Sequence, residues 1–65
     1  MLTQEEHWAR VVAWAVLTIF QKTGKVTIKS LMQETNIRRR DICASALYFE
    51  KYMGKELASE VINTL

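Results

Sequence analysis

Residues 28–47 read IKSLMQETNIRRRDICASAL and contain two helical segments separated by a turn. Apolar residues recur in the first segment at the i, i+3 and i+4 spacing of an amphipathic helix: Ile28, Leu31 and Met32. Asn36 tolerates the left-handed conformation in which many helices end, and Ile37 adds an apolar residue at the turn. The stretch therefore predicts a short helix, a tight turn and a second helix that begins near residue 38.

This second helix is expected over residues 38–53, with Gly54 as its stop. Its apolar residues share one face: Ile42, Ala46, Phe49 and Met53. The helix opens with Arg38, Arg39 and Arg40, although cations at a helix N-terminus cost roughly 0.3–1 kcal/mol each. A phosphate bound by the arginines and the free backbone N–H groups would offset this cost, so the cluster points to an anionic ligand.

Upstream, a longer helix is expected over residues 4–22, with a capping box between Thr3 and Glu6 and with Gly24 as its stop. Most of its surface is apolar. One face carries Trp8, Val11, Val12, Ala15, Val16 and Ile19. A second side carries Ala13, Leu17 and Phe20. Trp14 lies within the narrow polar strip that remains. A helix that is apolar nearly all round is buried on more than one side, so we expect a second copy or another protein to cover part of it.

Two shorter segments complete the chain. Residues 25–27 are compatible with an extended lead-in that ends at Thr27 as the N-cap of the following helix. Residues 55–65 carry Leu57, Val61 and Leu65 at helical spacing and predict a fourth helix or a helical tail used for dimerisation.

The length of 65 residues allows one small domain, residues 1–65. Two glycines and no proline argue against a β-sandwich or β-barrel, so the expected fold is all-α, with three to four helices. A very short β segment is compatible with the residues before the helix that begins at residue 28. So small a core needs a supplement, and Cys43 alone can form no internal disulfide. We therefore expect a homodimer.

The chain lacks the roughly 20-residue apolar run of a membrane span, and Glu5 and Glu6 precede its apolar stretch where a secretory signal has basic residues. These features predict a cytoplasmic protein without a membrane partner.

Charge is unevenly distributed along the sequence. The net charge is +2, but residues 22–40 hold six cations against Glu34 alone, a balance of +5. A basic segment of this kind is either a nucleic-acid footprint or a solvated surface, and charge alone leaves both interpretations open.

The order of a short helix, a turn and an arginine-led helix over residues 28–47 resembles the helix-turn-helix unit of DNA-binding regulators. The extended lead-in before residue 28, together with the long helix expected over residues 38–53, is most similar to the winged-helix branch of this group. Leu31, Ile37 and Ile42 stand where that unit keeps buried apolar residues, and Asn36 stands at its turn glycine. The sequence departs from the pattern at four points: Met32 replaces a small residue, Ser45 an apolar one, Arg38 an N-capping Ser or Thr, and no wing follows Gly54.

The resemblance implies sequence-specific binding of double-stranded DNA by a small transcriptional regulator or by a replication or partition accessory factor. The small size of the protein suits a protein encoded by a phage, a plasmid or another mobile element. The residues expected to contact DNA lie on the helix over residues 38–53 or before it: Arg38, Arg39, Arg40, Cys43, Ala44, Leu47, Lys25 and Lys29. Arginine can bind the O6 and N7 atoms of guanine, and the other cations can hold phosphates.

The alternative is a protein-interaction module, an adaptor or inhibitor that binds a partner through the apolar surface of the first helix. The residues expected at a dimer or partner interface are apolar: Trp14, Leu17, Phe20, Leu57 and Val61. An enzyme is not expected, because neither His7 nor Cys43 has the partners that catalysis requires, and the sequence shows no metal-ligand spacing, cofactor motif or small-molecule site.

Overall fold

The computed structural model describes residues 3–65, and this part of the chain is all-α, as the sequence predicts, without a strand. Helix α1 spans Gln4–Thr23. The Glu6 N–H donates to Thr3 Oγ1 over 3.1 Å at its start, and the Gly24 N–H donates to the Phe20 carbonyl over 2.9 Å at its end. Gly24 has φ 73°, a left-handed conformation that costs glycine no steric strain.

Only half of the predicted capping box at the start of α1 is formed. The Thr3 hydroxyl accepts its bond as expected, but the Glu6 carboxylate accepts bonds from Lys51 and Tyr52 instead of turning back to Thr3. A charged donor from a distant helix replaces the local backbone donor.

Helix α2 spans Ile28–Thr35 and begins with a complete capping box. The Ser30 N–H donates to Thr27 Oγ1 over 3.1 Å, and the Thr27 N–H donates to Ser30 Oγ over 3.0 Å. The segment that precedes Thr27 forms no strand in the described chain, because no second segment lies beside it to pair with its backbone. It is held instead by Val26, whose side chain is buried.

The helix expected over residues 38–53 is interrupted, which corrects the prediction of one continuous helix. It comprises α3 (Arg39–Ser45), the 3₁₀ helix η1 (Ala46–Tyr48) and α4 (Phe49–Met53). Ser45 is fully buried, so its hydroxyl needs a partner, and it donates to the Ile42 carbonyl over 2.7 Å. The Ala46 N–H bonds to the Cys43 carbonyl, three residues back, instead of continuing the α-helical pattern.

Gly54 separates α4 from the last helix, α5 (Lys55–Asn63). Its φ of 84° and ψ of 162° lie in a region of backbone space that only glycine occupies readily. This residue therefore ends one helix and redirects the chain into the next without a wing.

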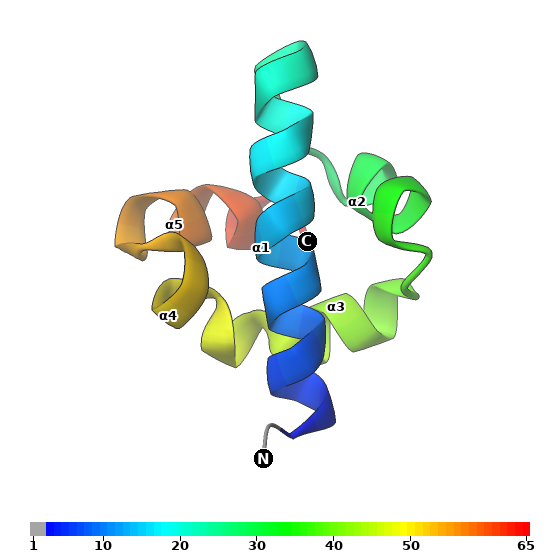
Figure 1. Ribbon diagram of the computed structural model, residues 1–65, viewed down its shortest axis with the longest axis vertical. Helices are drawn as coiled ribbons and strands as arrows, with labels where there is room; N and C mark the ends of the chain where they lie inside the picture. The colour runs from blue at the N-terminus through cyan, green and yellow to red at the C-terminus, as the bar shows by residue number, and fades with distance from the viewer. Residues whose placement is uncertain (1–2) are drawn as a thin grey trace.

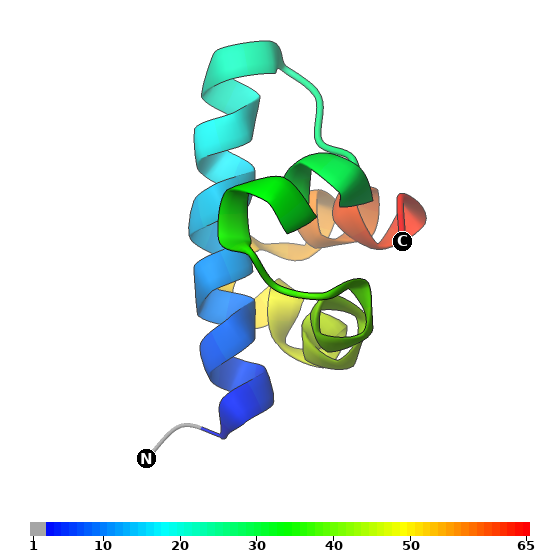
Figure 2. The ribbon, with the colours of Figure 1, turned by 90° about the vertical axis from the view of Figure 1, so that its right-hand side faces the viewer.

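The helices form two layers, with α1 on one side and all the others on the opposite side (Figures 1 and 2). Helices α2, α3 and α4 pack against α1, and α5 packs against α4. The core between the layers is made by eleven residues: Ala9, Val12, Ala15, Val16, Ile19, Val26, Leu31, Ile42, Phe49, Ala58 and Val61.

The opposite side of α1 is uncovered. Trp14 is 66% exposed and Leu17 is 53% exposed, whereas Val12 and Val16 on the inner side are fully buried. The single chain therefore covers one side of α1 only, and the expectation that a second copy or another protein covers the rest stays a prediction.

Candidate nucleic-acid interface

Helix α3 has one buried side and one exposed side. Ile42 and Ser45 are fully buried. The exposed residues lie on the other side, at the i, i+3 and i+4 spacing of one helix face continued into η1: Arg39, Arg40, Cys43, Ala44 and Leu47. Leu47 is the most exposed large apolar residue described, at 82%. We call these five residues the α3 face.

The turn between α2 and α3 is fixed by local hydrogen bonds. Thr35 Oγ1 donates to the Leu31 carbonyl over 2.7 Å and accepts from the Ile37 N–H over 3.2 Å. Asn36 has φ 61°, the left-handed conformation predicted for it, and Ile37 is partly buried against the core. The start of α3 is thereby held beside the end of α2, on the right-hand side of the molecule in Figure 1 and facing the viewer in Figure 2.

The three arginines at the start of α3 are all exposed but differ in their partners. Arg38 Nε donates to Asp41 Oδ2 over 3.3 Å, which is the local pairing that the solvated-surface interpretation anticipates. Arg39 and Arg40 form no ion pair within residues 3–65. Two guanidinium groups on the α3 face are therefore free to meet an external anion.

Two lysines extend the positive charge from the arginines to the other end of α2. Lys25 lies in the connection before α2, Lys29 lies in its first turn, and both side chains are exposed. Arg38, Lys25 and Lys29, together with the arginines of the α3 face, thus occupy consecutive elements of the chain.

Two of the departures from the helix-turn-helix pattern have a structural explanation. Met32 is 38% exposed, so its bulk is not enclosed between α2 and α3. The bond from the Ser45 hydroxyl to the Ile42 carbonyl satisfies its polar group in a buried position, and α3 ends at this residue. Helix α3 is therefore only two turns long, and η1 carries the face on to Leu47.

The structure divides the residues predicted for a dimer or partner interface. Trp14 and Leu17 lie on the uncovered side of α1, whereas Phe20 and Leu57 are partly buried against the core. Val61 is only 1% exposed and belongs to the core, so it is not available to a partner. The prediction of Val61 at an interface is therefore wrong, because helical spacing does not tell whether the residue's own chain or another covers it.

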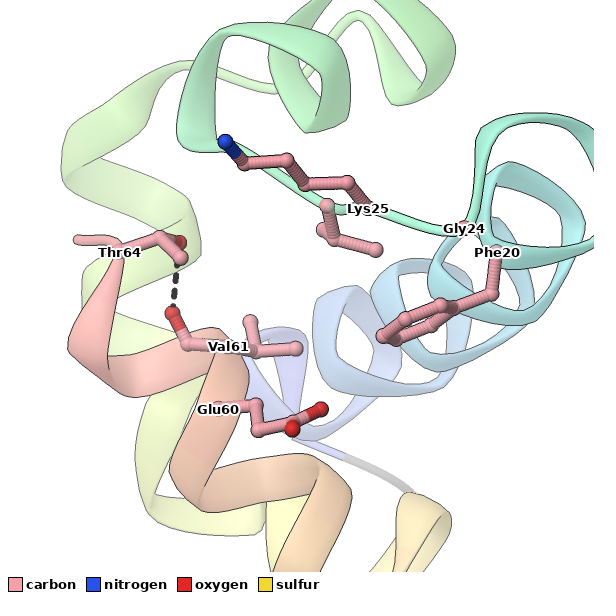
Figure 3. Close-up of a pocket in the computed structure, with 7 residues that line it drawn as sticks. Phe20, Gly24, Lys25, Glu60, Val61 and Thr64 are labelled. Atoms are coloured by element: carbon pink, nitrogen blue, oxygen red, sulfur yellow. Dashed lines mark hydrogen bonds between the residues drawn. The ribbon is translucent and has the colours of Figure 1, made fainter.

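Phe20 and Val61 meet in an open hollow of about 250 Å³ between the end of α1, the following connection and α5 (Figure 3). Lys25 and Glu60 lie on opposite sides of it and form no ion pair in the described structure. Thr64 Oγ1 donates to the Val61 carbonyl over 2.8 Å and is not free for a ligand. The hollow therefore presents no converging set of polar groups.

A polar cluster that the sequence did not reveal joins α1 to α4. Glu6 Oε2 accepts from Lys51 Nζ over 2.7 Å and from the Tyr52 hydroxyl. The hydrogen bond from Lys51, followed by that from Tyr52, holds the pKa of Glu6 below its usual value. Hydrogen bonding to Glu6 raises the pKa values of both Lys51 and Tyr52. Since the partners are 45 and 46 residues apart, no local pattern marks them.

His7 and Cys43 are both exposed. The search of residues 3–65 found no group of three or more His, Cys, Asp or Glu side chains that could hold a metal ion.

None of the helices in the described chain has the length and apolar character required to cross a membrane. Comparison of the chain with protein-family models, with curated proteins and with solved structures found no match.

Proposed function

We propose that the protein binds double-stranded DNA through the α3 face, with α3 as the recognition helix. One observation carries the proposal: the side of α3 that faces away from the core presents Arg39 and Arg40 without ion-pair partners in residues 3–65, followed by small and apolar side chains. A helix with this arrangement suits the major groove, which admits an α-helix and displays both hydrogen-bond acceptors and thymine methyl groups.

Each part of the α3 face matches a chemical feature of DNA. The guanidinium of Arg39 or Arg40 can donate two hydrogen bonds to O6 and N7 of guanine. Ala44 and Leu47 can contact the methyl group of thymine, while Cys43 is small enough to allow close approach. Lys25, with Lys29 and Arg38, supplies phosphate contacts that position the helix without reading bases.

The biological role that follows is that of a small DNA-binding regulator or of a replication or partition accessory factor. Both roles need a compact module that recognises a short site, and neither needs a catalytic centre. The target site itself must be found by selection from random duplexes.

The proposal is tested by fluorescence anisotropy with a labelled duplex obtained by that selection. Of Arg39→Ala and Arg40→Ala, measured separately, at least one should weaken specific binding by about 1–3 kcal/mol and relax the preference at one base pair. Lys55→Ala is the matched control, because it removes one exposed cation from α5, away from the α2–α3 turn (Figure 1). A loss in Lys55→Ala as large as in either arginine variant, or no binding by the unmodified protein, contradicts the proposal.

A function as an adaptor or inhibitor of another protein is the second candidate. It is favoured by the exposure of Trp14 and Leu17 on the uncovered side of α1. The two functions depend on different residues: replacing Arg39 and Arg40 should abolish the first and spare the second. The two unpaired arginines on the outer face of α3 favour the DNA-binding role.

A further inference from the structure

The uncovered side of α1 is apolar at its centre and polar at its ends. At 100° per residue, seven residues lie within about 60° of Trp14 around the helix. We call them the Trp14 face: His7, Arg10, Val11, Trp14, Leu17, Thr18 and Gln21. Trp14 is 66% and Leu17 53% exposed, and adjoining exposed apolar side chains of this kind often mark an interaction site.

The centre of the Trp14 face is prepared for apolar contact. Thr18 Oγ1 donates to the Trp14 carbonyl over 3.0 Å, so the hydroxyl hydrogen is already bonded within the helix. A shallow hollow of about 310 Å³, lined by His7, Arg10, Val11 and Trp14, lies beside the indole and can receive an apolar side chain.

The Trp14 face carries little charge. Arg10 is its only formally charged residue, and no carboxylate lies on it. We propose that the occupant is a second copy of this chain, with the two α1 helices antiparallel and a two-fold axis passing beside Trp14.

The antiparallel arrangement follows from the rise of 1.5 Å per residue along a helix. With the axis at Trp14, the two copies of Arg10 stand about 12 Å apart along the helices, beyond the screening length of about 8–10 Å at physiological salt. A parallel pair would place the two arginines side by side. The antiparallel pair also sets the two helix macrodipoles in opposite directions, which is favourable.

The same register matches the remaining residues of the face. The two Trp14 rings meet at the axis, and Val11 lies opposite Thr18 of the second copy. The aliphatic part of Arg10 lies against Leu17 of the second copy, while its guanidinium reaches solvent. His7 lies opposite Gln21 of the second copy, so each polar end of the face meets a polar end.

This dimer would place the two α3 helices on its outer sides. Helix α3 packs on the side of α1 opposite the Trp14 face, so three interhelical distances of 8–10 Å separate the two α3 axes laterally by about 24–30 Å. Because α3 crosses the N-terminal half of α1, antiparallel copies add an offset along the helices (Figure 1). The separation approaches the 34 Å of one DNA turn.

The two-fold axis also leaves both α2–α3 turns on the same side of the dimer, since it runs perpendicular to α1 within the interface. One duplex could therefore meet both copies of α3. The use of the dimer on DNA rests on the proposed function, whereas its formation does not.

Sedimentation equilibrium without DNA tests the dimer directly, over protein concentrations from about 1 µM to about 1 mM. The unmodified chain should dimerise, and Trp14→Glu should weaken dimerisation at least about 30-fold, as for a central aromatic anchor. Ile62→Glu is the matched control, because Ile62 is 45% exposed on α5 and should leave the dimer unchanged. Circular dichroism checks that both variants fold.

A monomer throughout this range, or an unaltered dimer in Trp14→Glu, overturns the inference. A monomer that binds DNA would overturn the dimer alone, and a dimer that binds no DNA would overturn the proposed function alone.

Disulfide cross-linking tests the orientation of the helices, with Cys43→Ser as the background. His7→Cys and Gln21→Cys keep Trp14 in place, and in the antiparallel dimer each position lies about 21 Å along the helices from its own copy. Neither variant should cross-link alone, because a disulfide needs Cα atoms within about 7 Å, but a mixture of the two should form a linked heterodimer. Self-linking of His7→Cys would indicate parallel helices and overturn the inference, as would a mixture that does not link.

Discussion

The salt dependence of DNA binding offers a quantitative test of which cations face the duplex. Five exposed cations lie on α3 or on the chain that leads to it: Lys25, Lys29, Arg38, Arg39 and Arg40. Each phosphate neutralised on B-DNA changes the logarithm of the association constant by about −0.9 per logarithmic unit of salt. On a mixed-sequence duplex no specific base is read, so the arginines of the α3 face also contact phosphates. Five contacts per chain then give a slope of about −4.5 and a loss of affinity of about 500-fold between 50 and 200 mM salt.

Replacing Arg38, Arg39 and Arg40 together by alanine should leave two contacts. The expected slope is then about −1.8, and the same change in salt should lower affinity only about 12-fold. Lys55→Ala should keep the unmodified slope, because this cation lies on α5. A dimer that engages both α3 helices doubles the slopes of the unmodified and triple-variant proteins.

Anisotropy titrations of a mixed-sequence duplex at four or more salt concentrations measure these slopes. An unchanged slope in the triple variant, or a fall of the same size in Lys55→Ala, would refute the assignment of the α3 face to DNA. Circular dichroism of each variant separates a lost contact from a lost fold, since the replaced side chains are exposed and should not affect stability.

Three further predictions concern stability, each measured by urea unfolding monitored by circular dichroism. Because the pKa of Glu6 is lowered in the folded state, its contribution to the free energy of unfolding should be present above its ordinary value of 4.5 and be lost as the pH falls through the folded value. The pKa values of Lys51 and Tyr52 are raised in the folded state, so their contribution should be lost at high pH, as the pH rises through the folded values. Glu6→Gln should flatten both ends of this profile, and a profile identical to that of the unmodified chain would argue against the cluster. Thr27→Ala should cost about 0.5–2 kcal/mol through loss of the α2 cap, while Thr27→Ser should cost much less; equal effects would exclude capping as the cause. Phe49→Ala should cost about 3–5 kcal/mol, a large part of the roughly 3–10 kcal/mol expected for a domain of this length, and an unchanged urea midpoint would contradict the burial of Phe49.

Much of the helical layout was predictable because helix ends are local events. Thr27 caps α2 through Ser30, three residues away, and Gly24 and Asn36 adopt left-handed conformations that these two residue types tolerate. Interactions over three or four residues leave a spacing that can be recognised without knowledge of the rest of the chain.

The continuity of the third predicted helix was not recoverable in this way. Ile42 and Phe49 are seven residues apart and would share one face of an unbroken helix, so the apolar pattern alone favours continuity. The break coincides with the complete burial of Ser45, whose hydroxyl bonds to the Ile42 carbonyl. Burial depends on the segments that pack around Ser45 and therefore cannot be read from the residues beside it in the sequence.

The candidate site was also predictable in part. Arg39 and Arg40 were identified from charge and position, and the structure shows that both are exposed and unpaired within residues 3–65. The interface residues were harder, because Trp14 and Val61 are both apolar residues at helical spacing, yet one is exposed and the other buried. Spacing gives the direction of a side chain around its own helix but not the identity of what covers it.

The sequence by itself determined the helical class, the chain turns and the concentration of positive charge before and at α3. These properties depend on residue type and on neighbours a few positions away. Tertiary structure alone decided that Glu6 meets Lys51 and Tyr52, that α3 ends after two turns, and that α1 is covered on one side only. The physical reason is that these features arise when segments distant in the chain exclude water from one another, and the free energy of that contact belongs to the pair of segments and not to either one.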